Sequence, residues 1–180
     1  HKTRTILTLV SIMAAFLLFG MLDGVRHSFN DAGKSAAGAE RLQTGSKLSF
    51  IETLPLSLDT QIAAVPGVKE VAYANWFGGA YQDAHNQIFS FAVSPNYIDL
   101  YPEINLDPGV RKAFDNTRTG VLVGDKLATK FHWKVGDKLP LISDIFPNSD
   151  GTKNWVFDIV GIMKPKPGER GQFFEGSVFL

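Results

Sequence analysis

The stretch ILTLVSIMAAFLLFGML, residues 6–22, decides how this chain is organised. Together with Thr5 it forms a run without a charged side chain, and Lys2 and Arg4 stand just before it. As a helix the run would be about 27 Å long at ~1.5 Å per residue, which nearly crosses the ~30 Å hydrocarbon layer of a membrane. No other part of the chain is as long and as apolar. The sequence therefore predicts a transmembrane helix over residues 1–25, followed by a water-soluble region.

Two other interpretations of this run are less well supported. A cleaved signal peptide has a shorter apolar core and a small-x-small cleavage site, whereas this run continues into Gly20-Met21-Leu22-Asp23 without an Ala-x-Ala. A core helix of a soluble protein has a polar face, but the polar residues Thr5, Thr8 and Ser11 all lie near one end of the run. A retained transmembrane helix is the interpretation we favour.

The orientation of this helix rests on the compartment, because the flanking charges do not decide it. Lys2 and Arg4 on one side are matched by Arg26 and Lys34 on the other. The chain has no cysteine and no Asn-x-Ser/Thr sequon, and it starts at His1, as a fragment would. These features suit a bacterial envelope domain that does without disulfides. We expect a cytoplasmic N-terminus, a helix in the inner membrane and a soluble domain in the periplasm.

The overall composition excludes one class of partner and supports a single domain. Eighteen basic residues balance eighteen acidic ones, so no net field attracts nucleic acid, and we expect no nucleic-acid partner. Fourteen Phe and three Trp supply enough apolar volume for one real core. The apolar run predicts contact with the lipid bilayer.

Turn signals and hydrophobic spacing predict an α+β fold beyond the membrane. The first part is expected to contain a stalk helix over residues 26–41, a strand over residues 42–51, a helix from an N-capping Ser57 to Val65, and a strand over residues 68–77. Later elements are expected as strands over residues 88–93, 121–123, 140–142, 155–163 and 177–180, and as helices over residues 95–101, 107–114 and 125–132. Residues 165–168 are expected to form an extended loop.

Reactive constellations are scarce. His27 and Asp31 stand four residues apart on the expected stalk, but two ligands do not make a metal site. Asp83 and His85 flank a turn, where a solvated pair is the plainer interpretation. Nucleophile-elbow, phosphate-loop and dinucleotide motifs are all missing from the sequence. We therefore predict no catalytic, cofactor-binding or metal-binding residue, and a chain that is not an enzyme.

Several short segments together carry a family resemblance. They are Arg4-Thr5 at the start of the apolar run, Val65–Val71 (VPGVKEV), Val93–Tyr97 (VSPNY), Val121–Gly124 (VLVG), Lys134–Leu139 (KVGDKL) and Phe157–Ile162 (FDIVGI). Each is weak alone. In this order and spacing the chain resembles the MacB-like periplasmic core domain of FtsX-type ABC transporter permeases, with their first transmembrane helix attached.

The resemblance implies a βαβ-type porter subdomain over about residues 42–87 and 163–180. It also implies an inserted mixed α/β subdomain over about residues 88–162, and a second porter half that follows in the parent protein with three more membrane helices. Such permeases work as dimers with a separate ABC-type ATPase, which binds ATP and Mg in the cytoplasm, and some contact a periplasmic adaptor protein. We expect export of a substrate, no cofactor on this chain, and a loop at Pro165–Gly171 that could meet an adaptor.

Two other functions stay open at this point. An extracytoplasmic ligand-sensing domain of a receptor, such as a sensor kinase, would need a pocket. Its candidate lining is aromatic, although core packing is the plainer role of these residues: Trp76, Phe77, Tyr81, Phe89 and Phe91. A membrane-anchored enzyme is the third hypothesis, and the missing catalytic motifs argue against it. The rest of the gene and its neighbours would separate the three.

Overall fold

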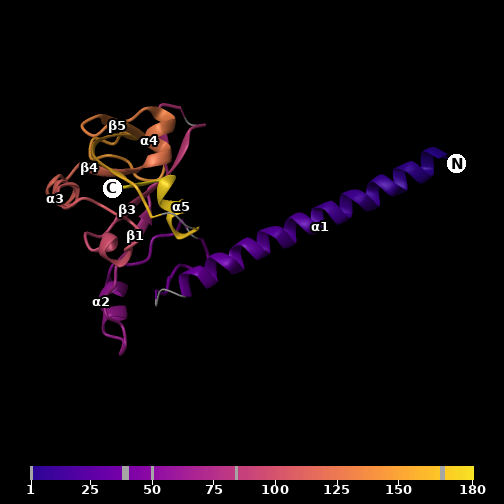
Figure 1. Cartoon of the computed structure of the whole chain (residues 1–180), viewed down its shortest axis with the longest axis horizontal. Coiled ribbons are helices and arrows are strands. Elements are labelled where there is room, and N and C mark those ends of the chain that lie inside the picture. The colour runs from indigo at the N-terminus through magenta and orange to yellow at the C-terminus, as the bar shows by residue number, and fades with distance from the viewer. Residues whose placement is uncertain (1, 38–40, 50, 84, 167–168) are drawn as a thin grey trace. The chain divides into compact units, whose positions relative to one another are not determined.

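The computed structural model describes residues 2–37, 41–49, 51–83, 85–166 and 169–180 (Figure 1). The chain divides into two compact units, His1–Thr44 and Gly45–Leu180. The overall class is the predicted one, an apolar N-terminal helix followed by a sheet-rich α+β domain.

The first unit consists mainly of α1, Lys2–Ala37, a helix of 36 residues. Its stretch Lys2–His27 is long and apolar enough to cross a membrane, and none of the 18 most apolar consecutive residues in it is buried. Large apolar side chains on it are exposed over about half to three quarters of their surface, from Ile12 at 52% to Phe19 at 75%. The predicted stalk continues α1 without a break as far as Ala37, whereas residues 41–46 are not helical.

The strand predicted over residues 42–51 is wrong. Residues 41–49 form no strand, and residue 50 lies outside the described part of the chain. Leu42 and Leu48 are 95% and 86% exposed. The alternating pattern was real, but a strand needs a neighbour for its backbone groups, and here none of the described strands runs beside it.

The next element, α2 (Ser57–Ala63), agrees with the sequence except at its start. The N-cap position is occupied by Leu56, and no side chain caps the helix, so the predicted capping role of Ser57 is wrong. No residue of α2 is buried. The helix therefore lies at the periphery of the second unit.

Seven strands form one sheet in the order β1-β3-β2-β5-β6-β4-β7. Their bounds are β1 Ala74–Trp76, β2 Gly79–Tyr81, β3 Gln87–Val93, β4 Gly120–Gly124, β5 Lys138–Ser143, β6 Asn154–Met163 and β7 Ser177–Phe179. Because β7 also pairs with β3, the sheet closes on itself and β2 to β7 form a small barrel. The β4–β6 and β3–β7 pairs are parallel and the others antiparallel. Only the last part of the strand predicted over residues 68–77 is present, as β1.

The barrel interior is filled by side chains that alternate with exposed ones along the strands. In β5 the burial follows this alternation, with Leu139 and Leu141 almost completely buried and Lys138 and Pro140 exposed. The strand residues of this first core are Ile88, Val121, Val123, Leu139, Leu141, Phe157, Ile159 and Val178. Barrels of this size have room for side chains but not for a channel.

A second core lies on the outer face of the barrel under three short helices, the 3-10 helix η1 (Tyr97–Leu100), α3 (Pro108–Asn116) and α5 (Glu169–Glu175). A fourth helix, α4 (Asp125–Phe131), packs on the first core through Leu127, Ala128 and Phe131. Leu122, Met163 and Phe179 from the strands meet Ile98 of η1 and Phe174 of α5 in the second core. The outer face of the sheet is thus apolar where helices cover it.

Strand β2 and helix α5 are the elements that the sequence analysis missed, because it assigned residues 79–81 and 169–175 to no strand or helix. A tight approach fixes the end of α5 against β4. A Cβ at Gly124 would lie 2.3 Å from the backbone oxygens of Phe174 and Glu175, so only glycine fits there. The expected helix over residues 95–101 is also corrected: it is the shorter 3-10 helix Tyr97–Leu100, with Asn96 at its N-cap position.

The proposed split into porter and inserted subdomains stays a prediction. Residues 45–180 form a single compact unit, and strands from both expected parts pair within one sheet, as β3 does with β7.

Candidate functional site

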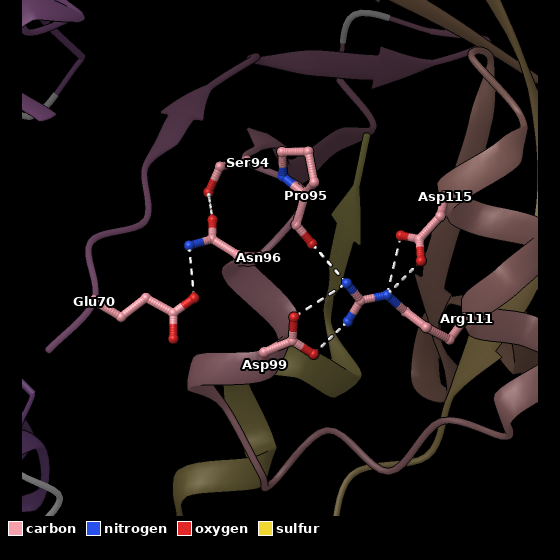
Figure 2. Close-up of polar contacts among 7 residues, drawn as sticks. All are labelled: Glu70, Ser94, Pro95, Asn96, Asp99, Arg111 and Asp115. Atoms are coloured by element: carbon pink, nitrogen blue, oxygen red, sulfur yellow. Dashed lines mark hydrogen bonds and ion pairs between the residues drawn. The ribbon is translucent and has the colours of Figure 1, made fainter. Parts of the chain in front are cut away.

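A group of polar residues joined by hydrogen bonds and ion pairs surrounds the turn between β3 and η1 (Figure 2). We call it the turn network; its members are Glu70, Ser94, Pro95, Asn96, Asp99, Arg111 and Asp115. The residues come from three places: the segment before β1, the turn itself with η1, and α3.

Arg111 is the centre of one half of the network. Pro108 starts α3, which puts Arg111 in the first turn of the helix and Asp115 one turn later on the same side. Nη1 of Arg111 donates to Oδ1 of Asp99 at 2.6 Å, and Nη2 donates to Oδ2 of Asp99 at 3.1 Å and to the carbonyl of Pro95 at 2.9 Å. Nε donates to both carboxylate oxygens of Asp115, at 3.0 and 2.9 Å. All three guanidinium nitrogens are therefore used.

Asn96 is the centre of the other half. Its Nδ2 donates to Oε1 of Glu70 at 2.9 Å and to the carbonyl of Val71 at 2.8 Å. Its Oδ1 accepts a hydrogen bond from Oγ of Ser94 at 2.8 Å. The backbone of Ser94 and Tyr73 pairs in addition: N–H of Ser94 donates to the carbonyl of Tyr73 at 2.9 Å, and N–H of Tyr73 donates to Oγ of Ser94 at 3.1 Å.

The charges of the turn network favour a structural role, holding chain segments together, over a catalytic or ligand-binding role. The hydrogen bond to Asp99, assisted by Asp115, raises the pKa of Arg111, so the guanidinium stays charged at any physiological pH. One cation faces two carboxylates, and its side chain is only 25% exposed. A reacting group or a ligand would have to break existing bonds to enter, so the arrangement is suited to holding three chain segments together.

One family model matches nearly the whole chain. The family model described as the MacB-like periplasmic core domain matches residues 5–180. The chain belongs to this family. The resemblance inferred from the short segments is thereby confirmed. No curated protein matches the chain significantly.

Membership of the MacB-like family defines the class of the protein. The family is a permease component of ABC transporters, which is not the enzymatic subunit, and it implies partnership with an ABC ATPase in general. A periplasmic core domain behind an apolar N-terminal helix indicates a membrane protein with a periplasmic domain.

The segments that carry the resemblance to the MacB-like family have structural positions. VSPNY, residues 93–97, is the turn of the network and supplies Ser94 and Asn96. VLVG forms β4, KVGDKL forms the turn into β5, and FDIVGI lies in β6. Sequence analysis missed Arg111, for which the only available signal was the i, i+4 spacing to Asp115.

Of the two polar pairs considered from the sequence, only Asp83 and His85 lie fully within the described part of the chain. Nδ1 of His85 lies 2.7 Å from Oδ1 of Asp83, with side-chain exposures of 95% and 63%. The backbone N–H of His85, followed by its ring, lowers the pKa of Asp83, so the pair is a solvated turn. His27 is exposed on α1, and the side chain of Asp31 lies outside the described part. Among the described residues, His, Cys, Asp and Glu form no group of three that could hold a metal ion.

The aromatic residues that a sensor pocket would require fall into two groups: Phe77 and Tyr81 pack in or against the first core, whereas Trp76 contacts Phe89 and Phe91 edge-on. Phe77 is buried in the first core, in contact with Phe157 at 5.7 Å between ring centroids. Tyr81 packs edge-on against Trp133 at 5.0 Å. Phe89 is 56% exposed on the outer face of β3. These residues do not line one common pocket, which favours the packing role.

Proposed function

We propose that this chain is the first membrane helix and the periplasmic core of a permease subunit of the MacB/FtsX type. In this proposal the permease couples ATP hydrolysis by a separate cytoplasmic ATPase to a conformational change in the periplasm, and so exports a substrate across the envelope. ATP and Mg are bound by the ATPase alone. The N-terminus lies in the cytoplasm, and a second permease copy and a periplasmic adaptor complete the assembly.

One observation carries the coupling part of the proposal: α1 is longer than the membrane needs. Its 36 residues correspond to about 54 Å at ~1.5 Å per residue, against ~30 Å of hydrocarbon. The helix is unbroken from Lys2 to Ala37, across the end of the apolar run at Leu22. A continuous helix carries a displacement from one end to the other with little loss, because its backbone hydrogen bonds are stiff. An anchor alone would need only the first part.

The barrel supports the same proposal. Closure removes most free strand edges and fills the interior with side chains, so the barrel moves as a body and does not deform gradually. A domain without a reactive cluster but with a rigid core is suited to relaying movement or contacting partners. This reasoning favours a relay over a membrane-anchored enzyme.

The test requires the full-length permease with the ATPase encoded beside it, purified together and placed in lipid nanodiscs. Residues 1–180 contain no cysteine, so, once any cysteine elsewhere in the complex has been replaced, spin labels can be introduced at Arg26→Cys and Val135→Cys, both at exposed positions. We expect the distance between the labels to change between the nucleotide-free state and the state trapped with ATP and vanadate. We also expect ATP hydrolysis in this complex.

Gly24 offers a matched pair of variants for this experiment. Gly24→Pro removes a backbone donor and kinks the helix just beyond the apolar run, at a cost of ~3 kcal/mol. We expect it to abolish the nucleotide-dependent distance change while hydrolysis continues. Gly24→Ala meets nothing within 4 Å and favours the helix, so it should behave as the parent. A parent protein that ends near residue 180, or that copurifies with no ATPase, contradicts the proposal.

A further inference from the structure

Helix α2 is attached to the barrel through a short stretch of chain. None of its residues is buried, and the segment that follows it makes local bonds, such as N–H of Val68 to the carbonyl of Val65 at 3.1 Å. The chain is tied to the barrel at Glu70, Val71 and Tyr73, all of which bond to residues of the β3–η1 turn. The position of α2 thus depends on how firmly that turn is held.

The turn, in its own right, is held by Arg111. The guanidinium binds the carbonyl of Pro95 and the carboxylate of Asp99, one residue before and three residues after Asn96. Asn96 lies between these two anchors and reaches Glu70 with its amide. Fixing both flanks fixes the direction in which the Asn96 side chain points.

Arg111 can do this because the residue before it is locked onto the barrel. Val110 packs in the second core, and a Cβ at Gly161 of β6 would lie only 2.2 Å from Cγ1 of Val110. Gly161 therefore lets α3 approach the sheet closely. Consecutive residues on α3 face two ways, Val110 to β6 and Arg111 to the turn. The connection runs from β6 through α3 and the turn to the segment behind α2.

We infer that Arg111 is the positioning residue of a latch, the turn network, which holds the segment carrying α2 on the barrel and passes movement between the two. The part about movement rests on the proposed function. The part about holding does not, and it can be tested on the chain alone. Lysine would not replace Arg111, because an ammonium group cannot bind two carboxylates and a carbonyl in one planar fork.

The first experiment measures the spread of distances between α2 and the barrel in the full chain in nanodiscs. Spin labels are placed at Thr60→Cys on α2 and at Val135→Cys before β5, both exposed. We expect a narrow distribution in the parent, a distribution at least twofold wider in Arg111→Met, and an intermediate one in Arg111→Lys. Lys153→Met, which breaks the exposed Lys153–Asp144 pair elsewhere on the barrel, is the matched control and should match the parent.

Hydrogen exchange separates positioning from a general loss of stability. Arg111→Met should speed exchange of the Tyr73 and Ser94 amides at least tenfold while the Val123 amide in β4 is unchanged. If Arg111→Met fails to fold, Asn96→Ala replaces it, because it cuts the bonds of Asn96 to Glu70, Val71 and Oγ of Ser94 and leaves the bonds of Arg111 intact. Equal widths in Arg111→Met (or Asn96→Ala) and Lys153→Met would overturn the inference.

The second experiment tests the movement in the complex with the ATPase. With labels at Arg26→Cys and Val135→Cys, Arg111→Met should reduce the nucleotide-dependent distance change by at least half, with hydrolysis within twofold of the parent. A full change in Arg111→Met would refute the part of the inference that concerns movement. If the parent itself shows no nucleotide-dependent distance change, the proposed function fails. The widths of the distance distributions between residues 60 and 135, measured without the ATPase, still decide whether Arg111 holds the turn network in place.

Discussion

Two apolar stretches of this chain have similar composition and opposite surroundings. In α1, Leu17 and Phe19 are 62% and 75% exposed. In β4, Val121, Leu122 and Val123 are 0% exposed. The stretch in α1 is long enough to be surrounded by the lipid of a bilayer. The stretch in β4 is short, and its side chains are covered by other strands and helices.

The difference between α1 and β4 indicates that the length of an apolar run, more than its hydrophobicity, determines whether it lies in a lipid bilayer or in the protein interior. A run of helix-forming residues satisfies its backbone internally and can face lipid on all sides. A run of strand length cannot, so it requires neighbours, and β4 has β6 on one side and β7 on the other. The same substitution in both places should therefore have different consequences.

The largest effect is expected from Leu139→Asp in β5. Leu139 is fully buried, and a carboxylate there has no partner in the first core. Loss of the leucine costs ~2–3 kcal/mol and an unpaired buried charge costs several more, which together approach the whole stability of a small domain. We expect the second unit not to fold, as measured by the absence of a cooperative urea transition. Lys138→Asp, one residue away and exposed, should retain the cooperative urea transition. Loss of the transition in both variants would contradict the explanation that burial of residue 139 causes the unfolding.

The matching change in α1, Leu17→Asp, should weaken the insertion of α1 into the membrane and leave the stability of the barrel unchanged. Leu17 lies about 4 Å from the middle of the Lys2–His27 span at ~1.5 Å per residue. An aspartate near the centre of a membrane helix costs ~2.5–3.5 kcal/mol of insertion free energy. We expect a smaller membrane-integrated fraction after carbonate extraction, and an unchanged urea midpoint for the barrel. A shifted midpoint would show that α1 packs on the second unit.

Sequence patterns predicted the core of the fold because burial there leaves direct marks. Val121–Val123 and residues 155–163 are apolar in runs that only a covered strand explains, and both are strands. The strand predicted over residues 42–51 failed, because alternation specifies a face but not a neighbour. Helix α5 was missed because seven residues between a proline-rich loop and a strand carry too little periodicity.

The turn network could be predicted only in part. VSPNY was recognisable as a segment, but the bond between Arg111 and Asp99 spans twelve residues and depends on how η1 and α3 pack. An arginine at i, i+4 from an aspartate is common on exposed helices and predicts no third partner. The chemistry of this site thus becomes visible only in the folded chain.

An intermediate effect is expected where the backbones of β4 and α5 lie close together. At Gly124, a Cβ would meet the backbone of α5 at 2.3 Å, and backbone cannot rotate away. Gly124→Ala should lower the free energy of unfolding by ~1–3 kcal/mol through overpacking. Gly109→Ala in α3 meets nothing within 4 Å and should raise it by up to ~1 kcal/mol. Urea denaturation of both variants measures the contrast, and a neutral Gly124→Ala would show that α5 is not fixed there.

The smallest effect is expected at an exposed ion pair on the outer face of the barrel, where water competes with the pairing of the two charges. Nζ of Lys138 lies 2.5 Å from Oδ1 of Asp158, and Oγ1 of Thr119 donates to Oδ2 of Asp158 at 2.8 Å. The hydrogen bond from Lys138, and then that from Thr119, lowers the pKa of Asp158 in the folded state. Because the folded pKa is below the unfolded value of ~3.9, the contribution to stability is complete above that value. It is lost as the pH falls through the folded pKa. We therefore expect the urea midpoints of the parent and of Asp158→Asn to differ slightly at pH 6 and to converge as the pH falls through the folded pKa. A difference that grows on acidification would mean that the carboxylate is destabilising in the folded chain.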